Sequence, residues 1–121
     1  MSKWSALVDF FESFGWDAYD ESDVPEDAGD RYITYETPYD NYGSVLPVTL
    51  NLYDRNTSKL PIMSKIEQIL NRIETMYPRG IPVPGGYLLV SKGSPFASPM
   101  NTEPEPWKRY VLNLNIEYLT N

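Results

Sequence analysis

The pattern that most constrains the fold is a strict alternation of side chains near the C-terminal end of the chain. Two interleaved sets of residues make up this segment, the first apolar or aromatic and the second largely polar: Tyr110, Leu112, Leu114, Ile116 and Tyr118 against Val111, Asn113, Asn115, Glu117 and Leu119. Because successive side chains of a strand point to opposite faces, this period of two predicts a strand over residues 108–119. One of its faces is buried and the other is mostly polar, which indicates a sheet that is covered on one side.

Three further segments are predicted to be strands. Residues 31–37 are rich in Tyr, Ile and Thr and end at Pro38. Residues 46–53 alternate with a period of two, and the turn-forming residues 40–43 before them favour an antiparallel hairpin with the preceding segment. Residues 87–91 are a short apolar run that we interpret as the fourth strand.

Two segments have the periodicity of amphipathic helices. Residues 3–14 place four apolar side chains on one stripe before Gly15: Leu7, Phe10, Phe11 and Phe14. Residues 59–77 show the stronger pattern, with Ser58 in the position of an N-cap and Gly80 beyond the end. Their apolar stripe consists of Ile62, Ile66, Ile69, Leu70, Ile73 and Met76.

These elements follow the order helix, two strands, helix, two strands. The order predicts an α+β fold, α-β-β-α-β-β, with a single antiparallel sheet of about four strands and two helices packed on one face. At 121 residues the chain has the length of one domain, which we expect to span residues 1–121. The strand over residues 108–119 is expected at the centre of the sheet. Its apolar face is expected to pack against four residues of the second helix: Ile66, Ile69, Leu70 and Ile73.

The composition argues against an enzyme. The chain has no cysteine and no histidine, so it has no thiol nucleophile, no Ser-His-Asp triad and no common zinc ligand set. We therefore expect no catalysis, no metal and no cofactor. The apolar runs are too short for a transmembrane helix, and Met1-Ser2-Lys3-Trp4 does not begin like a signal peptide, so we expect no membrane association.

The negative charge is concentrated in one segment. The net charge is −7, and residues 17–30 hold seven acids with no Lys or Arg: Asp17, Asp20, Glu21, Asp23, Glu26, Asp27 and Asp30. Three interpretations stay open: a solvated loop, a surface that repels nucleic acid or docks a basic partner, and a carboxylate metal site that lacks the spacing of a calcium loop. Because DNA affinity comes largely from neutralised phosphates, we expect no sequence-specific nucleic-acid binding.

A Pro-rich segment, residues 92–106, is predicted to be a long loop. It carries a candidate contact site in which two large apolar side chains lie beside prolines: Pro95, Phe96, Pro99 and Met100. These side chains either tuck into the core of the domain or form a stiff arm that contacts a partner, since prolines reduce the entropy lost on ordering. Residues 82–84 offer a second stiff segment of this kind.

Aromatic residues and carboxylates suggest two further hypotheses. The ten tyrosines and three tryptophans are many for this length, and such a density is typical of sheet packing, of protein interfaces and, less often, of carbohydrate binding. Five of the tyrosines surround the predicted hairpin: Tyr32, Tyr35, Tyr39, Tyr42 and Tyr53. Glu103, Glu105 and the acids of residues 17–30 are candidates for a glycosidase pair, but nothing in the sequence fixes a carboxylate separation.

Seven segments, in order along nearly the whole chain, carry a resemblance to a known family: Phe10–Gly15, Ala18–Tyr19, Val24–Ala28, Tyr32–Glu36, Pro84–Gly86, Gly93–Phe96 and Leu112–Thr120. Together they resemble phage tail terminator proteins, also called tail completion or minor tail proteins, of phages and prophages of Gram-positive bacteria. The resemblance implies a small α/β subunit that forms a ring, typically a hexamer, at the head-proximal end of the tail tube. There the ring stops polymerisation of the tube and presents a surface for the head.

The resemblance also implies the partners and the location. The partners would be further copies of the chain, the tail tube protein and a head–tail connector or head-closure protein, in the virion after assembly in the host cytoplasm. In such a ring, the acids of residues 17–30 would face the DNA path or a partner, and the segment with Phe96 and Met100 would contact a neighbouring subunit or the tube.

Two alternatives remain beside a tail terminator. One is another head–tail neck component, such as a head-closure protein. The other belongs to a different class, an acidic inhibitor that mimics DNA. A DNA mimic spreads its carboxylates in phosphate-like rows over the surface, whereas this chain gathers its excess acids in one segment.

Overall fold

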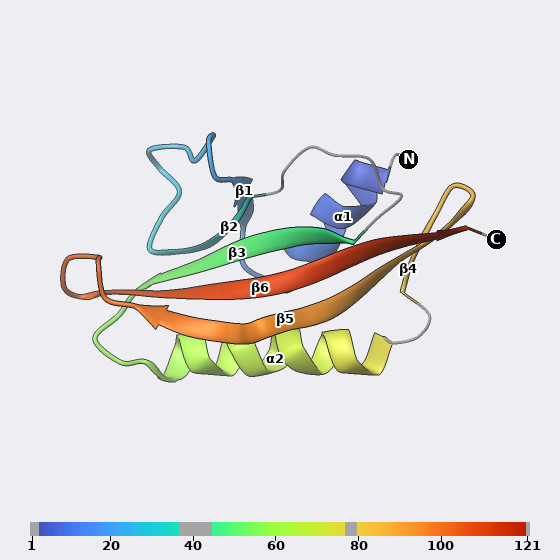
Figure 1. Cartoon of the computed structure of the whole chain (residues 1–121). Helices are drawn as coiled ribbons and strands as arrows, with labels where there is room; N and C mark the ends of the chain where they lie inside the picture. The colour runs from blue at the N-terminus through green and yellow to red at the C-terminus, as the bar shows by residue number, and fades with distance from the viewer. Residues whose placement is uncertain (1–2, 37–44, 77–79, 121) are drawn as a thin grey trace.

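The computed structural model describes residues 3–36, 45–76 and 80–120 (Figure 1). The elements, in chain order, are α1 (Lys3–Glu12), β1 (Ala18–Asp20), β2 (Arg31–Glu36), β3 (Leu46–Arg55), α2 (Leu60–Met76), β4 (Ile81–Val83), β5 (Gly86–Met100) and β6 (Trp107–Thr120). The strands form one curled sheet, a half-barrel, in the order β1-β2-β3-β6-β5-β4.

The prediction of a four-stranded antiparallel sheet is wrong. The sheet has six strands and is mixed, because β1 pairs in parallel with β2 while the other pairs are antiparallel. The edge strands β1 and β4 have three residues each, too few to produce a periodic pattern. The observed order is therefore α-β-β-β-α-β-β-β rather than α-β-β-α-β-β.

The prediction for residues 92–106 is wrong over its first part. β5 does not stop at Ser91 but continues to Met100, and its pairing with β6 shifts in register between Lys92 and Ala97. The irregular pairing accommodates Pro95, which has no N–H group to donate to the sheet. Residues 101–106 alone connect β5 to β6.

The central position of the C-terminal strand is confirmed. β6 lies between β3 and β5, and Leu114 is paired with Val48 on one side and Lys92 on the other. The alternation is also confirmed, since three of its apolar residues are fully buried: Leu112, Leu114 and Ile116. The antiparallel pairing of β2 with β3 agrees with the predicted hairpin.

Both helices pack into one core against the buried residues of the strands. α2 begins as expected, because the Ser58 hydroxyl accepts a hydrogen bond from the backbone N–H of Leu60 at 3.1 Å. α2 contributes four buried isoleucines: Ile62, Ile66, Ile69 and Ile73. Leu70, which was expected beside them, is only half-buried. We call the side of the sheet that the helices cover the helix face, and the other side the open face.

Candidate interaction surfaces

The open face carries a row of four half-buried aromatic rings, one from each of β1, β2, β3 and β6: Tyr19, Tyr32, Tyr53 and Trp107. Tyr32 lies at the centre of this aromatic row. Its ring centroid is 5.0 Å from that of Tyr53, in a stacked arrangement, 6.1 Å from that of Tyr19 and 6.2 Å from that of Trp107. These separations are typical of aromatic contacts, so the four rings form a continuous platform.

A polar network lies beside the aromatic row. The Arg109 guanidinium donates from Nε and Nη2 to Asn51 Oδ1 at 3.0 and 2.9 Å, and its Nη1 is 3.7 Å from Glu103 Oε1. Glu21 accepts hydrogen bonds from the Thr34 hydroxyl and the Asn51 amide. The side chains of Asn51 and Thr34 are buried, and these bonds satisfy their polar groups.

Carboxylates surround the aromatic row. Partial burial raises the pKa of Tyr19, and the negative charges of Asp17 and Asp27 raise it further. Partial burial also raises the pKa of Tyr32, and the negative charges of Glu103 and Glu21 make smaller contributions in the same direction. The aromatic row is therefore bordered by carboxylates, together with two ion-paired cations on the same face, Arg109 and Arg55.

The structure places the acids of residues 17–30 at the surface, as predicted. Asp20 is half-buried and the other six acids are exposed. Asp30 lies 3.8 Å from Arg55, a pairing between two exposed side chains that contributes little. That this segment faces a DNA path or a partner stays a prediction.

The predicted contact site in the Pro-rich segment is divided by the fold. Phe96 is half-buried against the core, whereas Met100 is exposed and Pro95 and Pro99 are exposed beside them. The Pro95 carbonyl accepts a hydrogen bond from the Asn113 amide at 2.9 Å. All four residues belong to β5 rather than to a free loop.

Two apolar patches not expected from the sequence lie at opposite ends of the long strands. The sheet patch consists of Val45, Tyr87 and Leu119, which are 51, 42 and 38% exposed. Tyr87 and Leu119 are register partners on β5 and β6, so their side chains are neighbours. The helix patch consists of Leu60 and Met63, which are 77 and 40% exposed at the start of α2.

The sequence carried weak signals for both patches. Leu119 belongs to the second set of the alternating C-terminal pattern, which a half-covered sheet leaves outside the core. Tyr87 begins the apolar run of residues 87–91, which shows no alternation. Leu60 and Met63 fall off the apolar stripe of the second predicted helix. Figure 1 shows the start of α2 and the start of β5 at opposite ends of the molecule.

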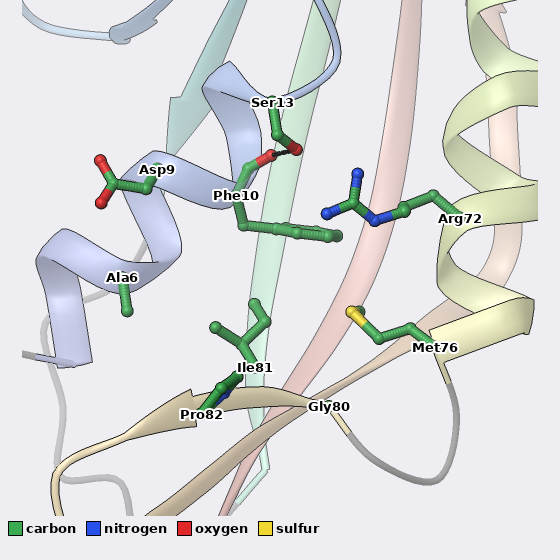
Figure 2. A pocket seen from close by; sticks show the side chains of 9 residues that line it. All are labelled: Ala6, Asp9, Phe10, Ser13, Arg72, Met76, Gly80, Ile81 and Pro82. Carbon is green, nitrogen blue, oxygen red and sulfur yellow. Dashed lines mark hydrogen bonds between the residues drawn. The ribbon is translucent and has the colours of Figure 1, made fainter.

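A hollow of about 300 Å³ lies between α1, the end of α2 and β4 (Figure 2). Its floor is apolar, and the Arg72 guanidinium lies 5.6 Å from the centroid of the Phe10 ring. Its titratable lining residues, within the described part of the chain, are Arg72 and Asp9. The hydroxyl of Ser13, which also lines the hollow, donates a hydrogen bond to the Phe10 carbonyl at 2.6 Å.

Glu103 and Glu105, two of the candidates for a glycosidase pair, each lie beside a cation. Glu103 is ion-paired with Arg109 at 3.7 Å, and Glu105 lies 3.5 Å from Lys108. Both carboxylates belong to the short connection between β5 and β6 and line a polar hollow of about 450 Å³.

Across residues 3–36, 45–76 and 80–120, no group of three or more acidic side chains is placed to hold a metal ion. In the same residues, neither helix is long and apolar enough to cross a membrane. No protein-family model and no curated protein sequence matches the chain.

Proposed function

We propose that the chain is a structural subunit of a phage tail, a terminator that assembles with copies of itself into a ring at the head-proximal end of the tail tube. The proposed role is assembly rather than catalysis. The ordered segments that resemble tail terminators support the assignment to a tail. The two apolar patches support the assembly of a ring, and this observation carries the proposal.

A ring requires two different surfaces on one subunit. In a head-to-tail interface, one surface of each subunit contacts a different surface of the next, and the ring closes when the rotation divides a full turn. The sheet patch and the helix patch have this relation, because they lie on different elements at opposite ends of the strands. Met100 lies at the same end as the helix patch, since it and Lys59 line one hollow.

Exposed apolar side chains of this size are suited to burial in an interface. Leu60 is 77% exposed although it lies in the first turn of α2, two residues after the capping residue Ser58. Met63, one turn later, lies on the same side of the helix. Burying an apolar side chain of this kind contributes roughly 1.5–3 kcal/mol, so a few of them can sustain an interface that avidity in a closed ring strengthens.

A mixing experiment tests the head-to-tail arrangement. The double variant Leu60→Glu/Met63→Glu blocks the helix patch, and Tyr87→Glu/Leu119→Glu blocks the sheet patch. Each variant alone should be monomeric by native mass spectrometry at concentrations where the unaltered chain forms rings. A 1:1 mixture should form heterodimers and nothing larger, because it contains one intact pair of surfaces. Homodimers of either variant would contradict the arrangement.

Co-expression with the tail tube protein of the same genome tests the assignment to a tail. Tubes made with the chain should be capped and of limited length in electron micrographs, and tubes made without it should be overlong. The two patch variants should behave like the absence of the chain. Tube lengths that do not depend on the chain would refute the assignment.

A further inference from the structure

We propose that the aromatic row and the carboxylates around it bind an arginine-rich segment of a partner protein. This surface lies on the open face at the end of the sheet that includes β1, away from the sheet patch. The inference does not depend on ring formation, because it rests on residues that belong to neither patch.

The molecule itself shows how this face holds a guanidinium. Arg109 lies with its guanidinium carbon 5.6 Å from the centroid of Tyr53 and with Nη1 3.7 Å from Glu103. An aromatic face and a carboxylate therefore act on the same cation. Arginine suits such a place better than lysine, because its flat guanidinium stacks on a ring and offers several N–H groups to oxygen acceptors.

The other end of the aromatic row offers the same chemistry without a resident cation. Asp17 precedes Tyr19 by two residues, and its carbonyl accepts a hydrogen bond from the Ile33 N–H at 2.8 Å, which places Asp17 beside β2 on the same side as Tyr19. Partial burial raises the pKa of Tyr19, and the charges of Asp17 and Asp27 raise it further. Both carboxylates are exposed, and within the described residues neither forms a salt bridge. Tyr19 belongs to β1, an edge strand of the sheet that the described residues form, so no strand of that sheet lies beyond it.

The sign of the charge selects the class of partner. Aromatic rows also stack the bases of single-stranded nucleic acids, but those sites combine the rings with a positively charged groove. Here Asp17, Asp27, Glu21 and Glu103 lie near the rings. Two cations share this face, and each already has an acidic partner: Arg109 is held by Asn51 and Glu103, and Arg55, the register partner of Trp107, lies 3.8 Å from Asp30. A basic protein segment is the complementary partner, and the attraction should weaken with salt.

The test titrates the 121-residue chain with an octa-arginine peptide, an octa-lysine peptide and an oligothymidine of similar length. Amide chemical shifts in nuclear magnetic resonance spectra locate the site, and fluorescence titration gives the dissociation constants. The variant Tyr19→Leu removes one ring at the edge of the sheet, and Asp17→Asn/Asp27→Asn removes two charges. The control Asp9→Asn/Glu67→Gln removes two exposed acids from the helices, on the other side of the sheet. Thermal unfolding verifies that each variant is folded.

We expect octa-arginine to bind more tightly than octa-lysine and to change the amide chemical shifts of the residues in the aromatic row. Tyr19→Leu should weaken octa-arginine binding by about threefold and leave octa-lysine nearly unchanged. The double charge variant should weaken both peptides by about fivefold or more, and the control variant should weaken neither. Equal affinity for the two peptides with no effect of Tyr19→Leu would overturn the proposal. So would shifts confined to other residues, or oligothymidine binding at the same row.

Discussion

Leu114 lies in the middle of the central strand, 1% exposed, with its side chain toward the core. We predict that Leu114→Asp prevents stable folding, because it places a charge without a partner among apolar side chains. The cost of such a change, several kcal/mol, is a large share of the roughly 5–15 kcal/mol by which domains are stable. Circular dichroism during urea unfolding measures the effect.

Leu119→Asp is the matched control for this prediction. It makes the same change on the same strand, but Leu119 is 38% exposed on the open face. Its stability should change by less than about 1 kcal/mol, as is usual for a surface substitution. If the two variants unfolded alike, the assignment of faces to β6 would be wrong.

Among the elements, the junction between α2 and β4 depends on Gly80. Its φ angle is +69°, and a Cβ atom there would lie 2.4 Å from the Leu88 carbonyl oxygen. We predict that Gly80→Ala destabilises the chain by about 2 kcal/mol or more, from the left-handed backbone conformation and from the collision with the backbone of β5. Thermal or urea unfolding measures the loss.

Gly29→Ala separates the two causes. Gly29 has a similar φ angle, +91°, but nothing lies within 4 Å of the place where a Cβ atom would be. Gly29→Ala should therefore lower the free energy of unfolding only by the cost of the left-handed backbone conformation, roughly 1–2 kcal/mol. Losses of equal size in the two variants would show that the contact with Leu88 is relieved at no cost.

Two residues in the irregular part of β5 are expected to act in different processes, Phe96 in folding and Met100 in assembly. Phe96 is half-buried against the core and Met100 is exposed. We predict that Phe96→Ala lowers the melting temperature by several degrees, because it removes packing from the core. Met100→Ala should leave the melting temperature unchanged and weaken ring formation, since its side chain lies at the end that carries the helix patch. Calorimetry and native mass spectrometry measure the two effects. The opposite pattern would reassign both residues.

How much of the fold was predictable depended on the length of each element. β3, β6 and the two helices are long enough for their periodicity to appear in the sequence, and their bounds were predicted within a few residues. β1 has three residues and pairs in parallel, which only the tertiary arrangement can determine. The second half of β5 was not predicted as a strand, because it contains prolines, and proline within an apolar run normally indicates a strand end.

The candidate surfaces were predictable only in part. The exposure of the acids in residues 17–30 followed from their charge. The aromatic row did not, because Tyr19 and Trp107 are far apart in the sequence and reach the same face through pairing across four strands. A local pattern shows which side chains are aromatic, but the register of the sheet decides which of them meet.

At the scale of the whole molecule, the two ends of the open face differ in chemistry. The end with the sheet patch is apolar, with Tyr87 beside Leu119. The end with the aromatic row is ringed by carboxylates. Only the sheet patch is separated from the aromatic row in this way, because the helix patch lies at the same end as the row, where Lys59, Met100 and Trp107 line one hollow.

The tyrosines of the sheet make the stability of the whole molecule depend on alkaline pH. Burial, and then nearby carboxylates, raise the pKa values of four tyrosines in the folded chain: Tyr19, Tyr32, Tyr35 and Tyr53. In the unfolded chain these groups ionise near about pH 10. The unfolded state therefore binds fewer protons above that pH, so the free energy of unfolding falls as the pH rises. Burial and the charge of Arg31 lower the pKa of Lys65, so its ionisation makes the free energy of unfolding rise with pH. This is a single group, whereas four tyrosines have the opposite effect.

We accordingly predict that the free energy of unfolding is constant between about pH 8 and pH 9 and declines above about pH 10, through the raised folded-state pKa values. Urea unfolding at a series of pH values measures the decline, and the ultraviolet absorbance of tyrosinate follows the ionisation. Tyr32→Phe keeps the ring at the centre of the aromatic row and removes its ionisable hydroxyl. Its decline should therefore be shallower than that of the unaltered chain. A free energy that stays level to about pH 11, or identical slopes for the two proteins, would show that these hydroxyls ionise alike in the folded and unfolded states.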